Sequence, residues 1–88
     1  LFLPYLGGER TPHNDPDLRG VLTGLAHETD RADLAQAVLE GVAFAFRDCL
    51  GALAEAGTTV VVADVVGGGA RSRAWIAVLA SVLAIPLR

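Results

Sequence analysis

Several residue types are absent from this 88-residue chain or nearly so. It has no Met and no Lys, and it contains one Cys, one Trp and one Tyr. Because it begins with Leu1 and lacks Met, we expect a segment of a longer protein. The one cysteine, Cys49, cannot form a disulfide within the chain, which favours a reducing, cytoplasmic setting. Its place in an apolar helical pattern predicts a small buried hydrophobe rather than a nucleophile.

Positive charge is scarce and dispersed. The seven basic residues are all Arg, they are scattered from Arg10 to Arg88, and the formal net charge is -3. A protein that follows a nucleic-acid backbone presents a basic stripe, so nucleic acid is not expected as a partner. The longest uncharged stretch, residues 74–87, falls short of the roughly 18 to 20 apolar residues of a membrane span. No membrane partner is expected.

The first third of the chain predicts two short strands around a loop. Residues 1–6 are apolar and end at Gly7 and Gly8. Residues 9–19 combine two Pro with Asn and Asp, which favours an irregular loop. Residues 20–25 contain Val and Leu and predict a second short strand.

A long helix is expected over residues 30–56. Thr29 or Asp30 can cap its start, and Gly57 supplies a stop. Phe44 interrupts the polar face, so the second half is apolar nearly all round and should pack on more than one side. One stripe is apolar, formed by Leu34, Val38, Val42, Phe46, Cys49 and Leu53, and the other side is polar, with Asp33, Gln36, Glu40 and Arg47.

The remaining residues predict another strand and another helix. Residues 58–66 are rich in Val, as in a central parallel strand covered on both faces. Ser72 can cap a second helix that extends to about Ala84, and Pro86 should begin a further strand. The order β-loop-β-α-β-α indicates the α/β class.

Three consecutive glycines, Gly67, Gly68 and Gly69, connect the predicted strand to the second helix. Glycine readily takes a positive φ, which we expect at Gly68, and without a Cβ it lets a ligand approach the backbone. A helix N-terminus adds unpaired N–H groups and a partial positive charge. Together these features suit phosphate or ribose oxygens. A tight turn packed against a neighbouring element is the alternative interpretation.

The standard nucleotide motifs do not match this loop. No Lys follows the glycines, as a Walker A sequence would require, and Ser72 stands at the sixth place of a dinucleotide-binding pattern. No acidic residue follows the loop either. A Walker or Rossmann assignment is therefore poor.

Glu9, His13, Asp15 and Asp17 raise the question of a metal site or of acid/base chemistry. If Asp15 and Asp17 were the first and third ligands of an EF-hand, Arg19 would occupy a position that needs an oxygen ligand, so this assignment fails. A solvated loop is the favoured interpretation. His27 is isolated and is expected at a strand end, and no catalytic triad can be assembled from the spacing.

Five stretches resemble a known family. Residues 20–25 and 33–40 look like the second signature of the FGGY carbohydrate kinases. Residues 3–6 and 8–13, the latter Gly-Glu-Arg-Thr-Pro-His, resemble the xylulokinase branch, and residues 67–72 resemble the adenosine-side loop of the family. The resemblance covers essentially the whole chain.

The resemblance implies a partial actin-like ATPase (ribonuclease H-like) domain, namely a fragment, residues 1–88, of the C-terminal, nucleotide-side domain of a sugar kinase. The parent would use ATP and Mg²⁺ to phosphorylate D-xylulose, with ATP and sugar bound between two domains. Gly67, Gly68, Gly69, Ala70 and Ser72 would lie near the nucleotide. The catalytic Asp and the β- and γ-phosphate loops of the family would lie outside this chain, so no catalytic residue is assigned to it.

The sequence departs from the family pattern at Gly7, where Ser is expected, and at Ala77 and Ser81, where Gln and Asp are expected. The last two make the second helix more apolar. Alternatives are a kinase for another ketose, a polyol or a sugar acid, and a non-catalytic binding or assembly module. The isolated chain is expected to be inactive and, because its strand edges and apolar faces are open, to self-associate.

Overall fold

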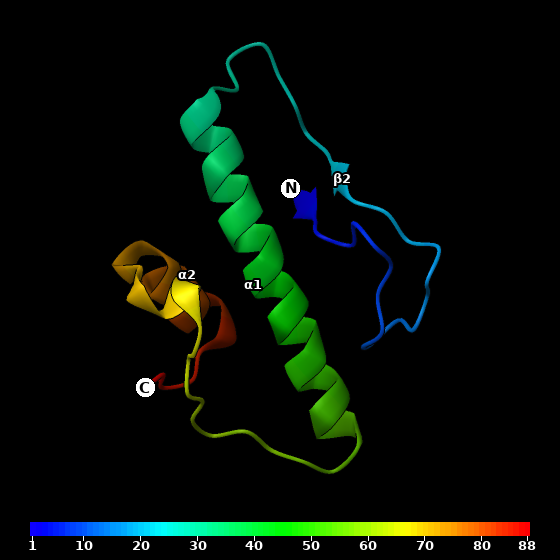
Figure 1. The fold of residues 1–88 in the computed structure, drawn as a ribbon, viewed down its shortest axis with the longest axis vertical. Coiled ribbons are helices and arrows are strands. Elements are labelled where there is room, and N and C mark those ends of the chain that lie inside the picture. Colours follow the sequence, from blue (N-terminus) through cyan, green and yellow to red (C-terminus); the bar gives the residue numbers. More distant parts are fainter.

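The computed structural model describes all residues of the chain, 1–88. Its elements are the strands β1 (Phe2–Leu3) and β2 (Val21–Leu22), the helix α1 (Arg31–Glu55), the 3₁₀ turn η1 (Gly68–Arg71) and the helix α2 (Arg73–Leu83). Helix α1 runs the length of the molecule, with β1 and β2 beside one flank and α2 beside the other (Figure 1). The chain is thus a small α/β unit organised around one helix.

Helix α1 begins and ends close to where the sequence predicted. A reciprocal capping box marks its start, because Asp30 Oδ1 accepts from the Asp33 amide at 2.8 Å and Asp33 Oδ2 accepts from the Asp30 amide at 3.1 Å. Asp30 is therefore the cap, whereas Thr29 Oγ1 accepts from the Ala26 amide. The helix stops before Gly57, which takes a φ of +94°.

The flank of α1 that faces β1 contains a glycine. Gly41 is buried, and a Cβ on it would collide with the carbonyl of Phe2. The backbone of β1 therefore lies directly on the helix at this point. With α2 packed elsewhere on the same helix, the prediction that α1 packs on more than one side is confirmed.

The two N-terminal strands are shorter than predicted. They pair antiparallel, with Phe2 opposite Leu22 and Leu3 opposite Val21, and Leu1 extends the pairing through bonds with Thr23. Residues 1–6 and 20–25 do not form strands over their full ranges, because the ladder pairs only Phe2–Leu3 with Val21–Leu22.

The predicted central strand over residues 58–66 is wrong in extent. Only residues 63–65 pair, in parallel with residues 86–88, through Ala63 N to Pro86 O, Arg88 N to Ala63 O, and Val65 N to Arg88 O, at 2.9 to 3.1 Å. A central strand bonds along both edges, whereas this segment has a partner along one edge only. Val66 is 85% exposed, so no element of this chain covers it.

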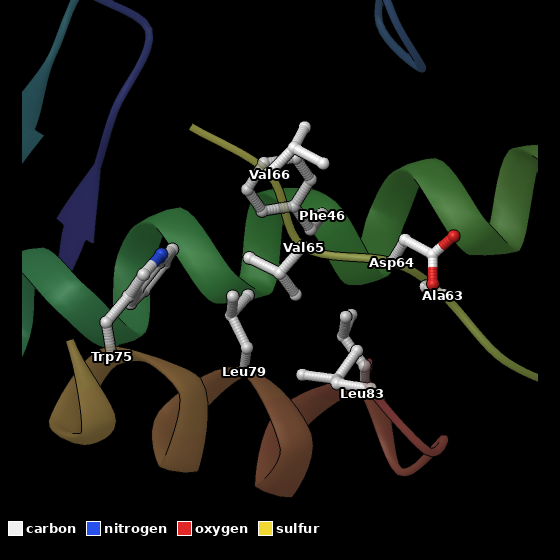
Figure 2. A pocket seen from close by; sticks show the side chains of 9 residues that line it. Phe46, Ala63, Asp64, Val65, Val66, Trp75, Leu79 and Leu83 are labelled. Carbon is white, nitrogen blue, oxygen red and sulfur yellow. The ribbon is translucent and has the colours of Figure 1, made fainter. Parts of the chain in front are cut away.

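Apolar side chains meet between α1, α2 and the segment 63–66. Figure 2 shows Trp75, Leu79 and Leu83 projecting from α2 toward α1. Leu79 is buried there, but the space retains an apolar cavity of about 290 Å³. Arg47, predicted on the polar face of α1, donates from Nη1 to the carbonyl of Val82 at 2.8 Å and joins the two helices. Neither helix combines the length and apolar character that a membrane crossing requires.

Candidate functional site

Residues 67–72 form a compact turn that delivers the chain to α2. Gly67 precedes η1, the Ala70 amide donates to the Gly67 carbonyl at 3.2 Å, and the Ser72 amide donates to the Gly69 carbonyl at 3.1 Å. Ser72 then caps α2, because its Oγ accepts from the Trp75 amide at 3.2 Å. The predicted role of Ser72 as the cap of the second helix is confirmed.

The three glycines have three different environments. Gly67 has a φ of +90°, a conformation that other residues rarely adopt. Gly68 is not in the left-handed region, and a Cβ on it would meet nothing within 4 Å. A Cβ on Gly69 would lie 3.0 Å from Cδ1 of Trp75. The positive φ expected at Gly68 is therefore found one residue earlier, at Gly67, directly before η1 begins.

The turn exposes backbone N–H groups that form no hydrogen bond within it. The first amide that finds an acceptor inside the turn is that of Ala70, so those of Gly68 and Gly69 remain available. The first turn of α2 contains no acidic residue that would offset the partial positive charge of the helix N-terminus. Arg71 and Arg73 add two exposed cations that take part in no ion pair of the chain. This end of α2 can accept an anionic or oxygen-rich ligand.

A hollow of about 300 Å³ adjoins the same turn. It is lined by residues of the turn and of both helices, mostly apolar: Val38, Leu39, Val42, Gly69, Ser72 and Trp75. Ligand sites commonly pair an apolar wall with a few polar groups in this way. An apolar ring can rest against this wall while polar groups reach the amides of the turn.

In the acidic loop near the N-terminus, carboxylates accept hydrogen bonds from the backbone of the same loop. The Glu9 carboxylate, whose side chain is only 8% exposed, accepts from the His13 amide at 3.0 and 3.2 Å. Asp15 Oδ1 accepts from the Asp17 amide at 2.9 Å. The interpretation of a solvated loop is thus wrong for Glu9, because its side chain is largely buried and bonds to the backbone of the loop. His27 lies in an exposed turn, not at a strand end, because β2 stops at Leu22.

Cys49 is half-buried, and its Sγ donates to the Thr11 carbonyl at 3.4 Å. Burial first, and then the negative charges of Glu9 and Asp48, raise the pKa of the Cys49 thiol above its usual value. A raised pKa keeps the group protonated, whereas a nucleophile needs the thiolate. The prediction of a packing role for Cys49 is consistent with this environment.

Comparison with known proteins identifies relatives over the whole chain. The model of the C-terminal domain of the FGGY family of carbohydrate kinases matches residues 1–88. Xylulose kinase of Escherichia coli strain K12 is 47% identical over 81 residues, which is 92% of this chain and 17% of that protein.

Solved structures agree with the sequence match. The crystal structure of a xyloylose kinase from Brucella ovis superposes with a TM-score of 0.94 at 57% identity, over 98% of this chain and 18% of that one. A gluconate kinase from Lactobacillus acidophilus gives 0.88 at 33% identity, over 99% of this chain and 18% of that one. The chain therefore spans less than a fifth of the length of these proteins.

Proposed function

The chain belongs to the FGGY family of carbohydrate kinases, and on that basis we propose that it is part of an enzyme that transfers the γ-phosphate of ATP to D-xylulose. The proposal for the sugar is supported by relatives and structural neighbours that carry the name xylulose kinase. We further propose that residues 1–88 are a piece of the nucleotide-side domain, with the actin-like ATPase (ribonuclease H-like) fold, and that the enzyme works in the cytoplasm.

The observation that carries the nucleotide assignment is the open turn at the start of α2. Its unused amides at Gly68 and Gly69 suit the ribose or phosphate oxygens of ATP. The apolar hollow beside Gly69 and Ser72 suits the adenine ring. We propose that Gly67, Gly68, Gly69, Ala70 and Ser72 form the contact surface for the adenosine part of ATP.

Magnesium is not assigned to this turn. Mg²⁺ prefers carboxylate and phosphate oxygens, and residues 67–72 contain no carboxylate. In kinases the metal neutralises charge that develops on the transferred phosphoryl group. The residues of this chain would bind and orient the nucleotide, and the metal would be held by ATP and by residues outside this chain.

The isolated chain is proposed to be catalytically inactive. Phosphoryl transfer depends on positioning and electrostatic stabilisation from several segments, and this chain offers one binding turn. A purified 88-residue chain should therefore give no ATP-dependent phosphorylation of D-xylulose, measured by mass spectrometry of the sugar. Turnover by a contaminant-free sample would contradict this part of the proposal.

The isolated chain is also proposed to self-associate. Residues 63–65 have one open backbone edge, and Val61 and Val66 beside them are 71% and 85% exposed. Open edges and contiguous apolar surface favour association. Light scattering at tens of micromolar should show assemblies; a stably folded, monodisperse monomer would contradict it.

The sugar and the class of protein are tested on the complete protein that carries this chain. Initial rates of ADP formation with D-xylulose, other ketoses, polyols and sugar acids should be highest with D-xylulose. The gluconate kinase among the structural neighbours makes a sugar acid the second candidate substrate. A non-catalytic assembly module would bind no ATP in a calorimetric titration, which would overturn the proposal.

A further inference from the structure

Trp75, the one tryptophan of the chain, stands between the two apolar spaces of the structure. It lines the cavity that contains Phe46 and Leu79, and it also lines the hollow that contains Val42 and Gly69. Figure 2 shows its ring rising from the first turn of α2 toward α1. Its ring therefore occupies the junction between α1 and the glycine turn.

The ring of Trp75 supports the turn at one glycine. A Cβ on Gly69 would lie 3.0 Å from Cδ1 and 3.1 Å from Nε1 of the indole, which is closer than such contacts ordinarily come. The backbone of Gly69 thus rests directly on the edge of the ring. A Cβ on Gly68, by contrast, would meet nothing within 4 Å.

The same residue also holds the other end of the turn. The backbone amide of Trp75 donates to Ser72 Oγ at 3.2 Å. Trp75 therefore fixes the turn at two points, by its ring under Gly69 and by its amide at Ser72. The unused amide of Gly69 belongs to the segment that these two contacts hold, and that of Gly68 comes directly before it.

We infer that Trp75 is a positioning residue that sets the height of the glycine turn and hence the affinity for ATP. This inference rests on the proposed nucleotide role of the turn. A larger residue at 69 lifts the turn off the ring, and a smaller residue at 75 removes its support. Because both changes act through one contact, their effects on ATP are not independent.

The test uses the complete protein with three variants, Gly69→Ala, Trp75→Leu and the double variant, each titrated with ATP and separately with D-xylulose. Leu lacks the Nε1 edge of the indole and rotates more freely, so it accommodates the methyl group that Gly69→Ala introduces. Gly51→Ala is the matched control, since a Cβ there meets nothing within 4 Å and the residue lies on α1 away from the turn.

We expect each single variant to weaken ATP roughly tenfold, which corresponds to about 1.4 kcal/mol, and to leave the D-xylulose dissociation constant unchanged. The double variant should lose no more than either single variant, and Gly51→Ala should bind ATP like the wild type. A double variant weakened by the product of the two single losses, roughly a hundredfold, would overturn the inference. Equal losses for ATP and D-xylulose would overturn it as well, because they indicate general damage.

The titrations distinguish a failure of the Trp75 role from a failure of the proposed function. If the wild type binds ATP and the two losses multiply, the positioning role of Trp75 is wrong and the proposed function stands. If the wild type binds no ATP, the proposed function fails and the inference fails with it.

Discussion

The loop of residues 7–19 and the turn of residues 67–72 lie on opposite flanks of α1 and use their backbone donors in opposite ways (Figure 1). In the first, Glu9 and Asp15 exchange backbone hydrogen bonds at 2.8 and 2.9 Å, and the Glu9 carboxylate receives the amide of His13. In the turn, the amides of Gly68 and Gly69 keep their bonding capacity. Polar residues alone therefore do not mark a binding site, since the carboxylates of Glu9 and Asp15 bond to the backbone of their own loop.

The glycines of the two regions make the same point. Gly8 and Gly67 adopt almost the same φ, +89° and +90°. A Cβ on Gly8 would lie 2.7 Å from the carbonyl oxygen of Pro16, whereas one on Gly67 would meet nothing within 4 Å. A positive φ thus serves internal packing in one region and leaves a surface open to a ligand in the other.

The largest expected effect is on nucleotide affinity. Gly68→Val in the complete protein should weaken ATP by roughly one to two orders of magnitude, or about 1.4 to 2.8 kcal/mol, because its methyl groups fill the open space over the turn. Backbone strain is not the cause, since Gly68 has no positive φ. The D-xylulose dissociation constant, measured without nucleotide, should change little. Unchanged ATP affinity would mean that the glycines only make a turn.

On the side of α1 that faces β1, a substitution should change the free energy of unfolding instead of ATP affinity. Gly41→Ala places a Cβ against the Phe2 carbonyl, and such overpacking destabilises a fold by about 1 to 3 kcal/mol. Urea unfolding of the complete protein should show this loss. The same exchange at Gly51, where a Cβ has open space, should be neutral or stabilising by up to about 1 kcal/mol. Equal effects at the two positions would refute the close approach of β1 to α1.

The two helix caps separate stability from binding. Asp30→Ala and Ser72→Ala each remove a cap bond, and each should cost about 0.5 to 2 kcal/mol in the free energy of unfolding. Only Ser72→Ala should also weaken ATP, because Ser72 lies in the open turn. If Asp30→Ala lowered ATP affinity as much as Ser72→Ala, the loss would not be specific to the open turn.

The smallest effect concerns Cys49, whose thiol contacts the loop of residues 7–19. Its pKa is raised in the folded state, so folding favours the thiol, and this contribution to stability is present below the pKa of the unfolded chain and is lost as pH rises through the folded pKa. Iodoacetamide at about pH 8, near the usual thiol pKa, should therefore modify Cys49 more slowly in native protein than in urea. Equal rates would show that burial does not protect the thiol.

Local signals predicted the helices well. Asp30, Gly57 and Ser72 fix ends of helices through bonds within a few residues, so the sequence carries the information directly. Arg47 was expected on a solvent-facing polar side, but its bond to Val82 joins residues far apart in the chain. No local pattern reveals such a contact.

The strands and the candidate site were predicted less completely, and for related reasons. The β-branched run of residues 58–66 predicted a strand, but pairing needs a partner, and only residues 86–88 provide one. The glycine turn was located from its composition, whereas the separate tasks of Gly67 and Gly69 depend on φ and on the Trp75 ring. The short spacing between Gly69 and Trp75, on either side of the Ser72 cap, was the available signal for that contact.

The link from Arg47 to Val82 restricts how the length of α1 can change. Val82 is one of the last carbonyls of α2, which lack partners within their own helix, and the last turn of α2 contains no basic residue. Gly41, less than two turns earlier on α1, must at the same time face Phe2. A single residue inserted between Gly41 and Arg47 would rotate the following part of the helix by about 100°. Related chains can therefore vary the surface of this stretch freely, but a one-residue insertion or deletion within it separates the two contacts.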